Sequence, residues 1–492
     1  MEFTAQEIIA LPSCLEVLQE GSAATSIGMA RWDSREVKPQ DLYCAFEGSR
    51  VDGHDFIASA LERGAGMIAL THEVEPAVMA RAQELGVWVV RISSLQAFLE
   101  DLARAWRNQL SAFVIGLTGS LGKTSTKGLL RDILSARFKV CATQGNQNNE
   151  LGVPATILQC PRDAEVLIVE MGMRGLGQIE ELCSYVRPHA ALITTIGISH
   201  IELLGSQENI ARAKSEICSH LDKQAESFVV LNAQDGFAPL ISDYAKLKDS
   251  GVDILGFAGS SEEILDSEGL FKDVAYFSDK SRDSRGFLQG KLTIGGSSID
   301  CKIPLRGEHN YINAAAAALA AYRIGMSLDQ IAHALNEVKT ESGRLEVQEV
   351  RLASHLDNEH ESKFSIINDA YNANPSSMAS ALDELSLFTS SSRRIAILGG
   401  MGELGECELE AHQTIGCHLA EKSPDLFIAV GDLAKIIAQS ASNAGYPAER
   451  ILFASDAQEA HTLLCSLVHA GDVVLLKGSH SYGLEEIIRR FD

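Results

Sequence analysis

A glycine-rich segment that ends in a lysine and two hydroxyl side chains is the part of the sequence best suited to chemistry. The apolar run 113–117 leads into Thr118-Gly-Ser-Leu-Gly-Lys-Thr124, and a helical pattern follows over 127–134. A strand, a glycine-rich turn and a helix in this order can cradle phosphate, because backbone N–H groups and the positive end of the helix dipole face the anion. Lys123 can reach the β- and γ-phosphates of a nucleotide, and the Thr124 hydroxyl can bind Mg²⁺.

The loop departs from the general phosphate-loop pattern G-x-x-x-x-G-K-[ST] at its first glycine, whose position falls on Leu117. A glycine-rich turn with an exposed lysine is the simpler alternative. The flanking strand and helix favour a nucleotide site. Its predicted contacts are Gly119, Ser120, Leu121, Gly122, Lys123, Thr124 and Ser125.

Two further side chains follow predicted strands and could bind a metal ion. Glu170 ends the apolar run 166–169, and a carboxylate beside a phosphate loop suits Mg²⁺ that bridges phosphate oxygens. A carboxylate that caps a turn is the alternative. His200 follows the run 192–196, where a metal ligand or a substrate contact would belong, although an isolated histidine is usually structural.

Other candidates have weaker signals. Lys214 lies in the helical stretch 210–217, where a solvated lysine is the default interpretation. The loops 146–154 and 369–377 are rich in asparagine, whose amide suits uncharged hydrogen bonding to sugar, peptide or phosphate. Simple turns would also explain both loops, but the second follows a predicted strand, which favours a site.

The elements that must position these residues fall into three regions, 1–108, 109–342 and 343–492. Continuous apolar runs alternate with helical patterns in the second and third regions, which predicts mainly parallel sheets covered on both faces. The predicted strands are 42–46, 66–70, 87–91, 165–170, 190–195, 227–231, 252–256, 364–368, 395–399, 426–430 and 473–477, and the predicted helices include 56–63, 94–109 and 313–325. A turn or an exposed excursion is expected at 279–285, and a loop at 354–363.

Size and charge limit the possible functions. A chain of 492 residues predicts about three domains at ~150 residues each. The net charge of -24, from 42 basic and 66 acidic side chains, argues against nucleic-acid or anionic-membrane binding. Ten cysteines without a C-x-x-C pair indicate reduced thiols. No basic leader and no apolar run near ~20 residues is present, so a cytoplasmic protein is expected.

Taken together, the motifs resemble the Mur ligases of peptidoglycan synthesis. The matching segments are Asp33-Ser-Arg35, Asp52-Gly-His54, 118–124, 145–154, 169–172, His200, 213–216, 307–310, Gly343-Arg344, 369–375, 398–405 and 477–479. The resemblance implies an α/β protein of three domains. They are a small N-terminal α/β domain for a UDP-sugar (1–108), a central P-loop ATPase with a mainly parallel sheet (109–342) and a C-terminal Rossmann-like domain (343–492).

The resemblance also implies a reaction and its participants. An ATP-dependent ligase would activate UDP-MurNAc-tripeptide as an acyl phosphate, which the amine of D-Ala-D-Ala would attack. Lys123, Lys214 and His200 would be catalytic, with Lys214 carbamylated. Thr124, Glu170, His200 and Lys214 would bind Mg²⁺, two ions in all. Asn310, Arg344 and Asp369 would contact the adenine, phosphate and ribose of ATP. The substrate contacts would be Ser34, Arg35, Asn148, Asn149, Asn372 and Asn374.

Two positions depart from the family pattern: Thr195 stands where asparagine is common, and His480 stands where arginine is usual. Two other functions remain open: a related ligase of the folylpolyglutamate synthase type, and an NTP-hydrolysing switch or motor. The first should lack the segments 369–375 and 401–405, and the second leaves Lys214 and the N-terminal region unexplained. A monomer is expected. The third residue of the tripeptide, meso-diaminopimelate or lysine, stays open.

Overall fold

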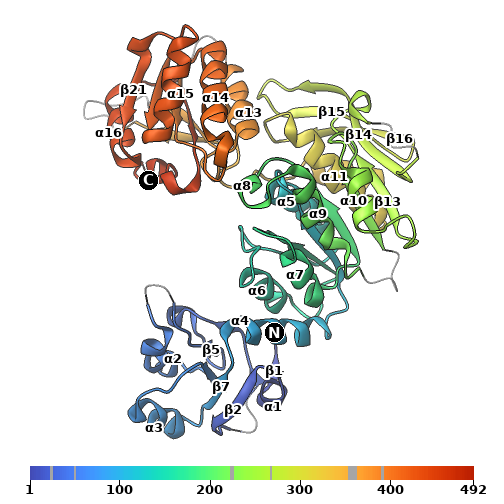
Figure 1. The fold of residues 1–492 in the computed structure, drawn as a ribbon, viewed down its shortest axis with the longest axis vertical. Coiled ribbons are helices and arrows are strands. Elements are labelled where there is room, and N and C mark those ends of the chain that lie inside the picture. Colours follow the sequence, from blue (N-terminus) through green and yellow to red (C-terminus); the bar gives the residue numbers. More distant parts are fainter. Residues whose placement is uncertain are drawn as a thin grey trace. The chain divides into compact units, whose positions relative to one another are not determined.

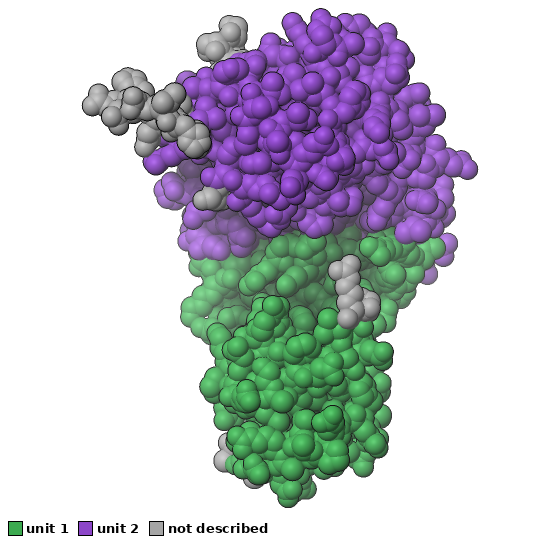
Figure 2. All heavy atoms as spheres, turned by 90° about the vertical axis from the view of Figure 1, so that its left-hand side faces the viewer, with its two compact units in different colours: residues 1–118, 137–192, 215–229 green, residues 119–136, 193–214, 230–492 purple. Residues whose placement is uncertain are grey.

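The structure is a computed structural model that describes residues 1–22, 26–48, 51–221, 227–265, 269–352, 363–388 and 393–491. The chain forms two compact units, which Figure 2 shows in different colours. Unit 1 comprises residues 1–118, 137–192 and 215–229, and unit 2 comprises residues 119–136, 193–214 and 230–492. Within the described parts of the chain, no helix combines the length and the apolar character needed to cross a bilayer.

The first part of unit 1 is built on a five-stranded sheet, which lies in the blue part of the ribbon in Figure 1. Its strands, in order across the sheet, are β2 (Cys14–Gln19), β7 (Trp88–Ile92), β6 (Met67–Leu70), β5 (Leu42–Cys44) and β4 (Ala30–Arg31), all parallel except β2. The shorter elements around it are β1 (Phe3–Thr4), β3 (Ser26–Ile27), α1 (Ala5–Ile9), η1 (Ser34–Glu36), η2 (Gly53–Phe56), α2 (Ile57–Glu62) and α3 (Pro76–Leu85). Three of these strands were predicted; β2 and β4 were not.

Helix α4 (Leu95–Arg107) follows this sheet and packs on α6 (Gly152–Gln159) and α7 (Gln178–Val186). Ser94 caps its start by accepting a hydrogen bond from Ala97 N. Its buried face repeats at helical spacing through Leu95, Phe98, Leu99, Leu102 and Trp106. In the same unit, β9 (Val140–Ala142), β10 (Val166–Glu170) and β8 (Phe113–Thr118) are parallel neighbours in that order.

Nine strands make the central sheet, in the order β16-β15-β14-β13-β12-β11-β8-β10-β9. The strands not yet given are β11 (Ala190–Ile193), β12 (Phe228–Asn232), β13 (Asp253–Phe257), β14 (Asp273–Arg282), β15 (Leu288–Ile294) and β16 (Ser297–Ile303). The helices of this region in unit 2 are α5 (Lys123–Ser135), α8 (Ile201–Leu204), α9 (Gln207–Ser215), α10 (Ala238–Tyr244), α11 (His309–Arg323) and α12 (Leu328–Leu335). Strands β14, β15 and β16 are antiparallel, so the expected excursion at 279–285 is partly strand: β14 continues through Arg282 before the chain turns.

The last part of unit 2 is a six-stranded sheet, shown in orange and red in Figure 1. Its order is β17 (Glu346–Arg351), β18 (Lys363–Asn368), β22 (Val473–Lys477), β19 (Arg394–Leu398), β20 (Leu426–Val430) and β21 (Ile451–Ala454), and only β17 is antiparallel. The helices are α13 (Pro375–Ser386), α14 (Glu408–Lys422), α15 (Asp432–Asn443), α16 (Ala457–Leu467) and α17 (Glu486–Arg489). Of the loop expected at 354–363, only Lys363 is among the described residues, and it begins β18.

Successive residues of these strands enter two different cores, one on each face of the sheet. Ala396 and Leu398 of β19 pack with α13, α14 and α15, whereas Ile395 and Ile397 pack with α16 and α17. Side chains alternate across a strand, so a sheet covered on both faces needs apolar residues at every position. This explains the continuous apolar runs and confirms the predicted parallel α/β class.

Candidate nucleotide-binding active site

The phosphate loop occupies the turn predicted for it, between β8 and α5. Gly119 and Gly122 both have positive φ angles, 150° and 76°. A Cβ atom on Gly119 would lie 1.8 Å from Thr194 Oγ1, and one on Gly122 would lie 2.6 Å from Asn313 Oδ1. Both glycines are therefore required by backbone conformation and by close packing.

Hydrogen bonds hold the loop against the end of β11. Ser120 N donates to Thr195 O at 2.7 Å, and the Thr194 hydroxyl donates to Leu121 O. Lys123 Nζ donates to Gly119 O at 2.7 Å, which keeps the ammonium group against the loop itself. The side chain of Thr195, the first departure from the family pattern, donates to Thr194 O and accepts a hydrogen bond from Asn232 Nδ2 at 3.1 Å.

Lys214 is buried near the end of α9, with 2% of its surface exposed. Burial lowers the pKa of its amine well below the ordinary value, and the charge of Lys123 lowers it further. The alternative of a solvated lysine is therefore wrong. A neutral amine is the form that reacts with CO₂, so the environment of Lys214 suits carbamylation.

His200 precedes α8 in a left-handed backbone conformation, with φ of 64°. Its Nδ1 lies 2.9 Å from Glu403 Oε2, in a turn that follows β19. Glu403 was not predicted as a site residue, because no sequence pattern links an acidic residue in one loop to a histidine about 200 residues earlier in the chain.

Glu170 ends β10 in unit 1 and is fully buried. Its register partner in β8 is Leu117, two residues before the loop glycine Gly119. Asn148 Nδ2 donates to Glu170 Oε1 at 2.8 Å, so the structure brings these two predicted residues together. Asn149 instead accepts a hydrogen bond from Gly152 N at 2.9 Å at the start of α6, which is a structural contact.

Asp369 and Lys477 form a buried ion pair at the carboxyl ends of β18 and β22. Lys477 Nζ lies 2.6 Å from Asp369 Oδ2 and also donates to Asn372 O at 2.9 Å. Burial raises the pKa of the Asp369 carboxyl and lowers the pKa of the Lys477 amine. Lys477 was not among the predicted site residues, although its place at the end of an apolar strand was a usable signal.

The other predicted residues of unit 2 have varied surroundings. The Arg344 guanidinium lies over the Tyr371 ring, 4.5 Å from its centroid. Asn374 caps α13 by accepting a hydrogen bond from Ser377 N, and Asn372 accepts one from Ala373 N. His480, the second departure from the family pattern, is exposed, and its Nδ1 lies 3.4 Å from Glu485 Oε1.

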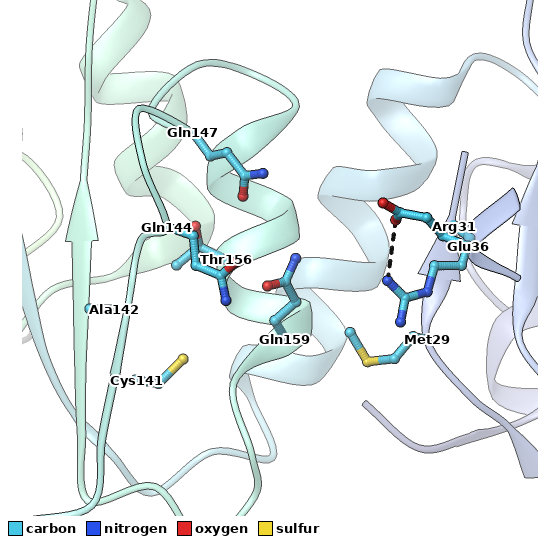
Figure 3. A pocket seen from close by; sticks show the side chains of 9 residues that line it. All are labelled: Met29, Arg31, Glu36, Cys141, Ala142, Gln144, Gln147, Thr156 and Gln159. Atoms are coloured by element: carbon cyan, nitrogen blue, oxygen red, sulfur yellow. Dashed lines mark ion pairs between the residues drawn. The ribbon is translucent and has the colours of Figure 1, made fainter. Parts of the chain in front are cut away.

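Unit 1 also contains a cavity of about 490 Å³ (Figure 3). Glutamine side chains line one side, and Arg31 and Glu36 face them from the other. The lining residues are Met29, Arg31, Glu36, Cys141, Ala142, Gln144, Gln147, Thr156 and Gln159. Primary amides and a guanidinium group suit a ligand that has both uncharged polar groups and an anionic group.

The predicted substrate residues Ser34 and Arg35 lie in η1, beside Glu36 of this cavity. Ser34 is buried, whereas the Arg35 side chain is 83% exposed and pairs with Asp33 at 2.7 Å. Hydrogen bonding from the Arg35 side chain lowers the pKa of Asp33 to about 2. Arg35 is therefore held at the surface beside the cavity rather than within its lining.

Three protein-family descriptions match the chain in succession. Residues 26–107 match the catalytic domain of the Mur ligase family, residues 117–321 match the Mur ligase middle domain, and residues 351–480 match the glutamate ligase domain of Mur ligases. These matches span all three regions that the sequence analysis separated.

Individual relatives match over nearly their whole length. The UDP-N-acetylmuramoyl-tripeptide–D-alanyl-D-alanine ligase of Bacillus subtilis is 31% identical, over 93% of this chain and 91% of its own. The crystal structure of MurF from Acinetobacter baumannii has a TM-score of 0.81 at 27% identity and covers 100% of this chain and 99% of its own. MurF ligase from Thermotoga maritima, solved in complex with ADP, has a TM-score of 0.73 at 27% identity, over 94% and 97% of the two chains.

Proposed function

The chain belongs to the Mur ligase family, and on that basis we propose that it joins D-alanyl-D-alanine to UDP-N-acetylmuramoyl-tripeptide at the expense of ATP. The product is the UDP-MurNAc-pentapeptide precursor of peptidoglycan. The observation that carries this proposal is similarity at 31% identity over 93% of the chain to a ligase of that name. This similarity includes most of the N-terminal region, which a nucleotide switch would leave unexplained. It also includes the segment 369–375, which a folylpolyglutamate synthase should lack.

The proposed reaction has two steps. The carboxylate of the tripeptide attacks the γ-phosphorus of ATP, which gives an acyl phosphate and ADP. The amine of D-Ala-D-Ala then attacks the acyl carbon, loses a proton, and inorganic phosphate leaves. Two anions must approach each other in the first step, so cationic groups that offset their repulsion are needed.

We assign the nucleotide to the loop 119–125, with Lys123 beside its phosphates. Lys123 Nζ lies against loop carbonyls, within the turn where α5 begins, so its charge is placed where phosphate oxygens would be held. Asn310, Arg344 and Asp369 are the proposed contacts to adenine, phosphate and ribose. The ADP complex of the Thermotoga maritima relative supports nucleotide binding by this fold.

The residues proposed for Mg²⁺ are Thr124, Glu170, His200 and Lys214, the last as its carbamate. Mg²⁺ prefers oxygen ligands, and three of these four would supply oxygen: a hydroxyl, a carboxylate and a carbamate. Glu170 and Lys214 are buried, and buried carboxylate and carbamate groups suit a cation. The donor set therefore fits the ion, which when bound would neutralise charge on the transferring phosphoryl group.

We further propose that the cavity of unit 1 holds part of the UDP-sugar. Arg31, which lies 3.2 Å from Asp41 and 3.6 Å from Glu36, offers a guanidinium to a diphosphate, and the glutamine amides offer donors and acceptors to uncharged groups. Ser34, Arg35, Asn148 and Asn149 are the proposed contacts near it. Asn372 and Asn374 are proposed for the incoming dipeptide.

The three domains 1–108, 109–342 and 343–492 are proposed as modules for the sugar nucleotide, ATP and the ligation step. The matched ranges 26–107, 117–321 and 351–480 support these limits. A monomer in the cytoplasm is the proposed state of the protein, with no nucleic-acid or membrane partner, in keeping with its net charge of -24.

Mass spectrometry of reaction products tests the proposed function. The protein is mixed with ATP, Mg²⁺, D-Ala-D-Ala and UDP-MurNAc-tripeptide that carries either meso-diaminopimelate or lysine. A pentapeptide product with stoichiometric phosphate is expected with one of the two. Phosphate release without either acceptor would favour a switch. Glutamate is supplied in place of the dipeptide in a parallel reaction, and its ligation would favour a folylpolyglutamate-type enzyme.

A further inference from the structure

A buried carboxylate in unit 2 connects the helix after β18 to the region of the proposed adenine contact. Glu384 lies on α13 and is 1% exposed. Its Oε2 lies 2.9 Å from Arg282 Nη1, and its Oε1 lies 3.1 Å from Arg306 Nη1. Gly307 N donates to Oε2 at 3.2 Å. A buried carboxylate is costly unless it is paired and hydrogen-bonded, and these three donors satisfy Glu384.

α13 belongs to the region of the six-stranded sheet, whereas all three donors belong to the region of the nine-stranded sheet. Arg282 ends β14, and Arg306 and Gly307 form the turn before α11. Arg306 also lies over the ring of Phe388, with 4.4 Å between its Cζ and the ring centroid. Through its contacts with Arg306 and Gly307, Glu384 therefore holds the turn 306–310 against the end of α13.

From this turn a chain of side-chain hydrogen bonds leads to the phosphate loop. Asn310 Nδ2 donates to Arg306 O at 2.7 Å, and Asn313 Nδ2 donates to Asn310 Oδ1 at 3.1 Å. Thr126 Oγ1, on the first turn of α5, donates to Asn313 Oδ1 at 3.3 Å. Asn310, Asn313 and Thr126 are all buried, so water does not replace these bonds.

We propose that Glu384 is a positioning residue for nucleotide binding. Glu384 fixes the turn 306–310 so that Asn310 can contact the base while Asn313 accepts the hydrogen bond from Thr126 at the start of α5. This inference rests on the proposed function only in assigning adenine to Asn310. Glu384 itself touches no substrate; it acts through Arg306 and Gly307.

Discrimination between two nucleotides of equal charge tests the proposal. Calorimetric titration of the full chain with ADP and with inosine diphosphate, both with Mg²⁺, gives a ratio of dissociation constants that reports the contact to the base. Loss of the Glu384 charge would leave Arg282 and Arg306 without this partner. Any resulting change in attraction to phosphate would affect ADP and inosine diphosphate equally, so it would cancel in the ratio. The Glu384→Gln variant is expected to lose at least fivefold of the wild-type preference for ADP, as is Asn310→Ala.

Asp383→Asn is the matched control, because Asp383 neighbours Glu384 on α13 but pairs with His418 and Lys422, each at 2.9 Å. It is expected to change the ratio by less than twofold. Glu384→Asp, which keeps the charge on a shorter side chain, should recover part of the preference. If Glu384→Gln does not fold, Arg306→Lys carries the test, since it keeps the charge and removes the planar guanidinium fork.

A merely structural role would lower the urea midpoint of Glu384→Gln and leave the ratio unchanged, which would overturn the proposal. A wild-type protein that does not distinguish the two nucleotides, or an Asn310→Ala variant with the wild-type ratio, would also overturn it. Neither result would touch the proposed ligation, because the titrations contain no peptide acceptor and ligation is measured separately from its products.

Discussion

Lys477 and Asp369 form an ion pair that is largely shielded from water. Lys477 is 2% exposed, and its Nζ lies 2.6 Å from Asp369 Oδ2. The same amine donates to two backbone carbonyls of the segment that follows β18, those of Asp369 and Asn372. The pair therefore organises the loop that is proposed to meet both ribose and dipeptide.

Replacing Lys477 with methionine should destabilise the protein strongly. The carboxylate of Asp369 would stay buried without its charge partner, which typically costs about 3–5 kcal/mol. Urea unfolding measures this cost. The double variant Lys477→Met, Asp369→Leu should regain most of the stability, yet it should not regain ADP affinity, because Asp369 is the proposed ribose contact. Recovery of both properties would contradict that assignment.

An alanine at Gly119 should damage the phosphate loop through a steric clash. The new Cβ would meet Thr194 Oγ1 at 1.8 Å, and overpacking of this kind costs about 1–3 kcal/mol. ADP affinity should fall at least tenfold in calorimetric titration. Gly175→Ala is the control, since its nearest atom would be Gln178 Nε2 at 4.0 Å. Equal ADP affinity of the two variants would argue against this loop as the nucleotide site.

Continuous apolar runs predicted buried parallel strands but not strands rich in polar residues, such as β17 and the exposed end of β14. β19 and β22 are continuous apolar runs because both faces of each strand are covered. β17 contains four polar residues among six, three of them charged, and the exposed end of β14 is polar, so neither has a continuous apolar signal. Each forms a strand because it pairs with an antiparallel neighbour, β15 for β14 and β18 for β17. The residues of one strand do not reveal which segment will pair with it.

The candidate site could be predicted where its residues lie close together in the sequence. The turn 118–124 needs only its own glycines, lysine and threonine, so its pattern was sufficient. Glu403 and Glu384 have partners that tertiary folding brings to them, His200 for the first and Arg282 and Arg306 for the second. An acidic residue in a loop or on a helix has no sequence signal that distinguishes such a role from a solvated charge.

The stability of the protein should depend on pH through Asp235. Its carboxylate oxygens accept hydrogen bonds from Ile196 N and Phe237 N, but burial is the larger effect and raises the pKa of the carboxyl group. Because the folded pKa exceeds the unfolded value, the folded protein binds the proton more tightly. The contribution of Asp235 to stability therefore grows as pH falls through its folded pKa and diminishes as pH rises.

The Asp235→Asn variant lacks this titration and isolates it. Wild type should gain stability relative to the variant between pH 7 and pH 4, since all other groups titrate in both proteins. Urea midpoints at the two pH values measure the double difference. A difference that is independent of pH, or that shrinks in acid, would contradict the raised pKa.

Glu170 should control the response to Mg²⁺. Glu170→Gln keeps the shape of the side chain and an oxygen that can accept from Asn148, so the fold should persist. Loss of the charge should raise the Mg²⁺ concentration for half-maximal activity at least tenfold and lower kcat by roughly 10²–10³. Asn148→Ala should raise the Mg²⁺ requirement less than Glu170→Gln does, because Asn148 only orients the carboxylate. Unchanged Mg²⁺ dependence in Glu170→Gln would exclude it as a ligand.

Lys214 should be essential to turnover without being essential to the fold. Burying an amine is costly, and nothing in its lowered pKa indicates that its charge stabilises the folded protein. Lys214→Met keeps the length of the side chain, so thermal unfolding should occur at or above the wild-type temperature. Loss of the carbamate should lower kcat by roughly 10²–10³, the effect typical of removing one electrostatic contact to the transition state.

Carbon-13 NMR with labelled bicarbonate distinguishes a carbamylated Lys214 from one that acts as a free amine. Wild-type protein should show a carbamate carbon resonance that Lys214→Met lacks, and its activity should fall when CO₂ is removed and return when bicarbonate is added. A neutral amine reacts with CO₂ whereas an ammonium does not, so the burial that lowers the pKa of Lys214 would favour carbamylation at this position. Activity that is indifferent to CO₂, together with a fully active Lys214→Met protein, would remove Lys214 from the metal site.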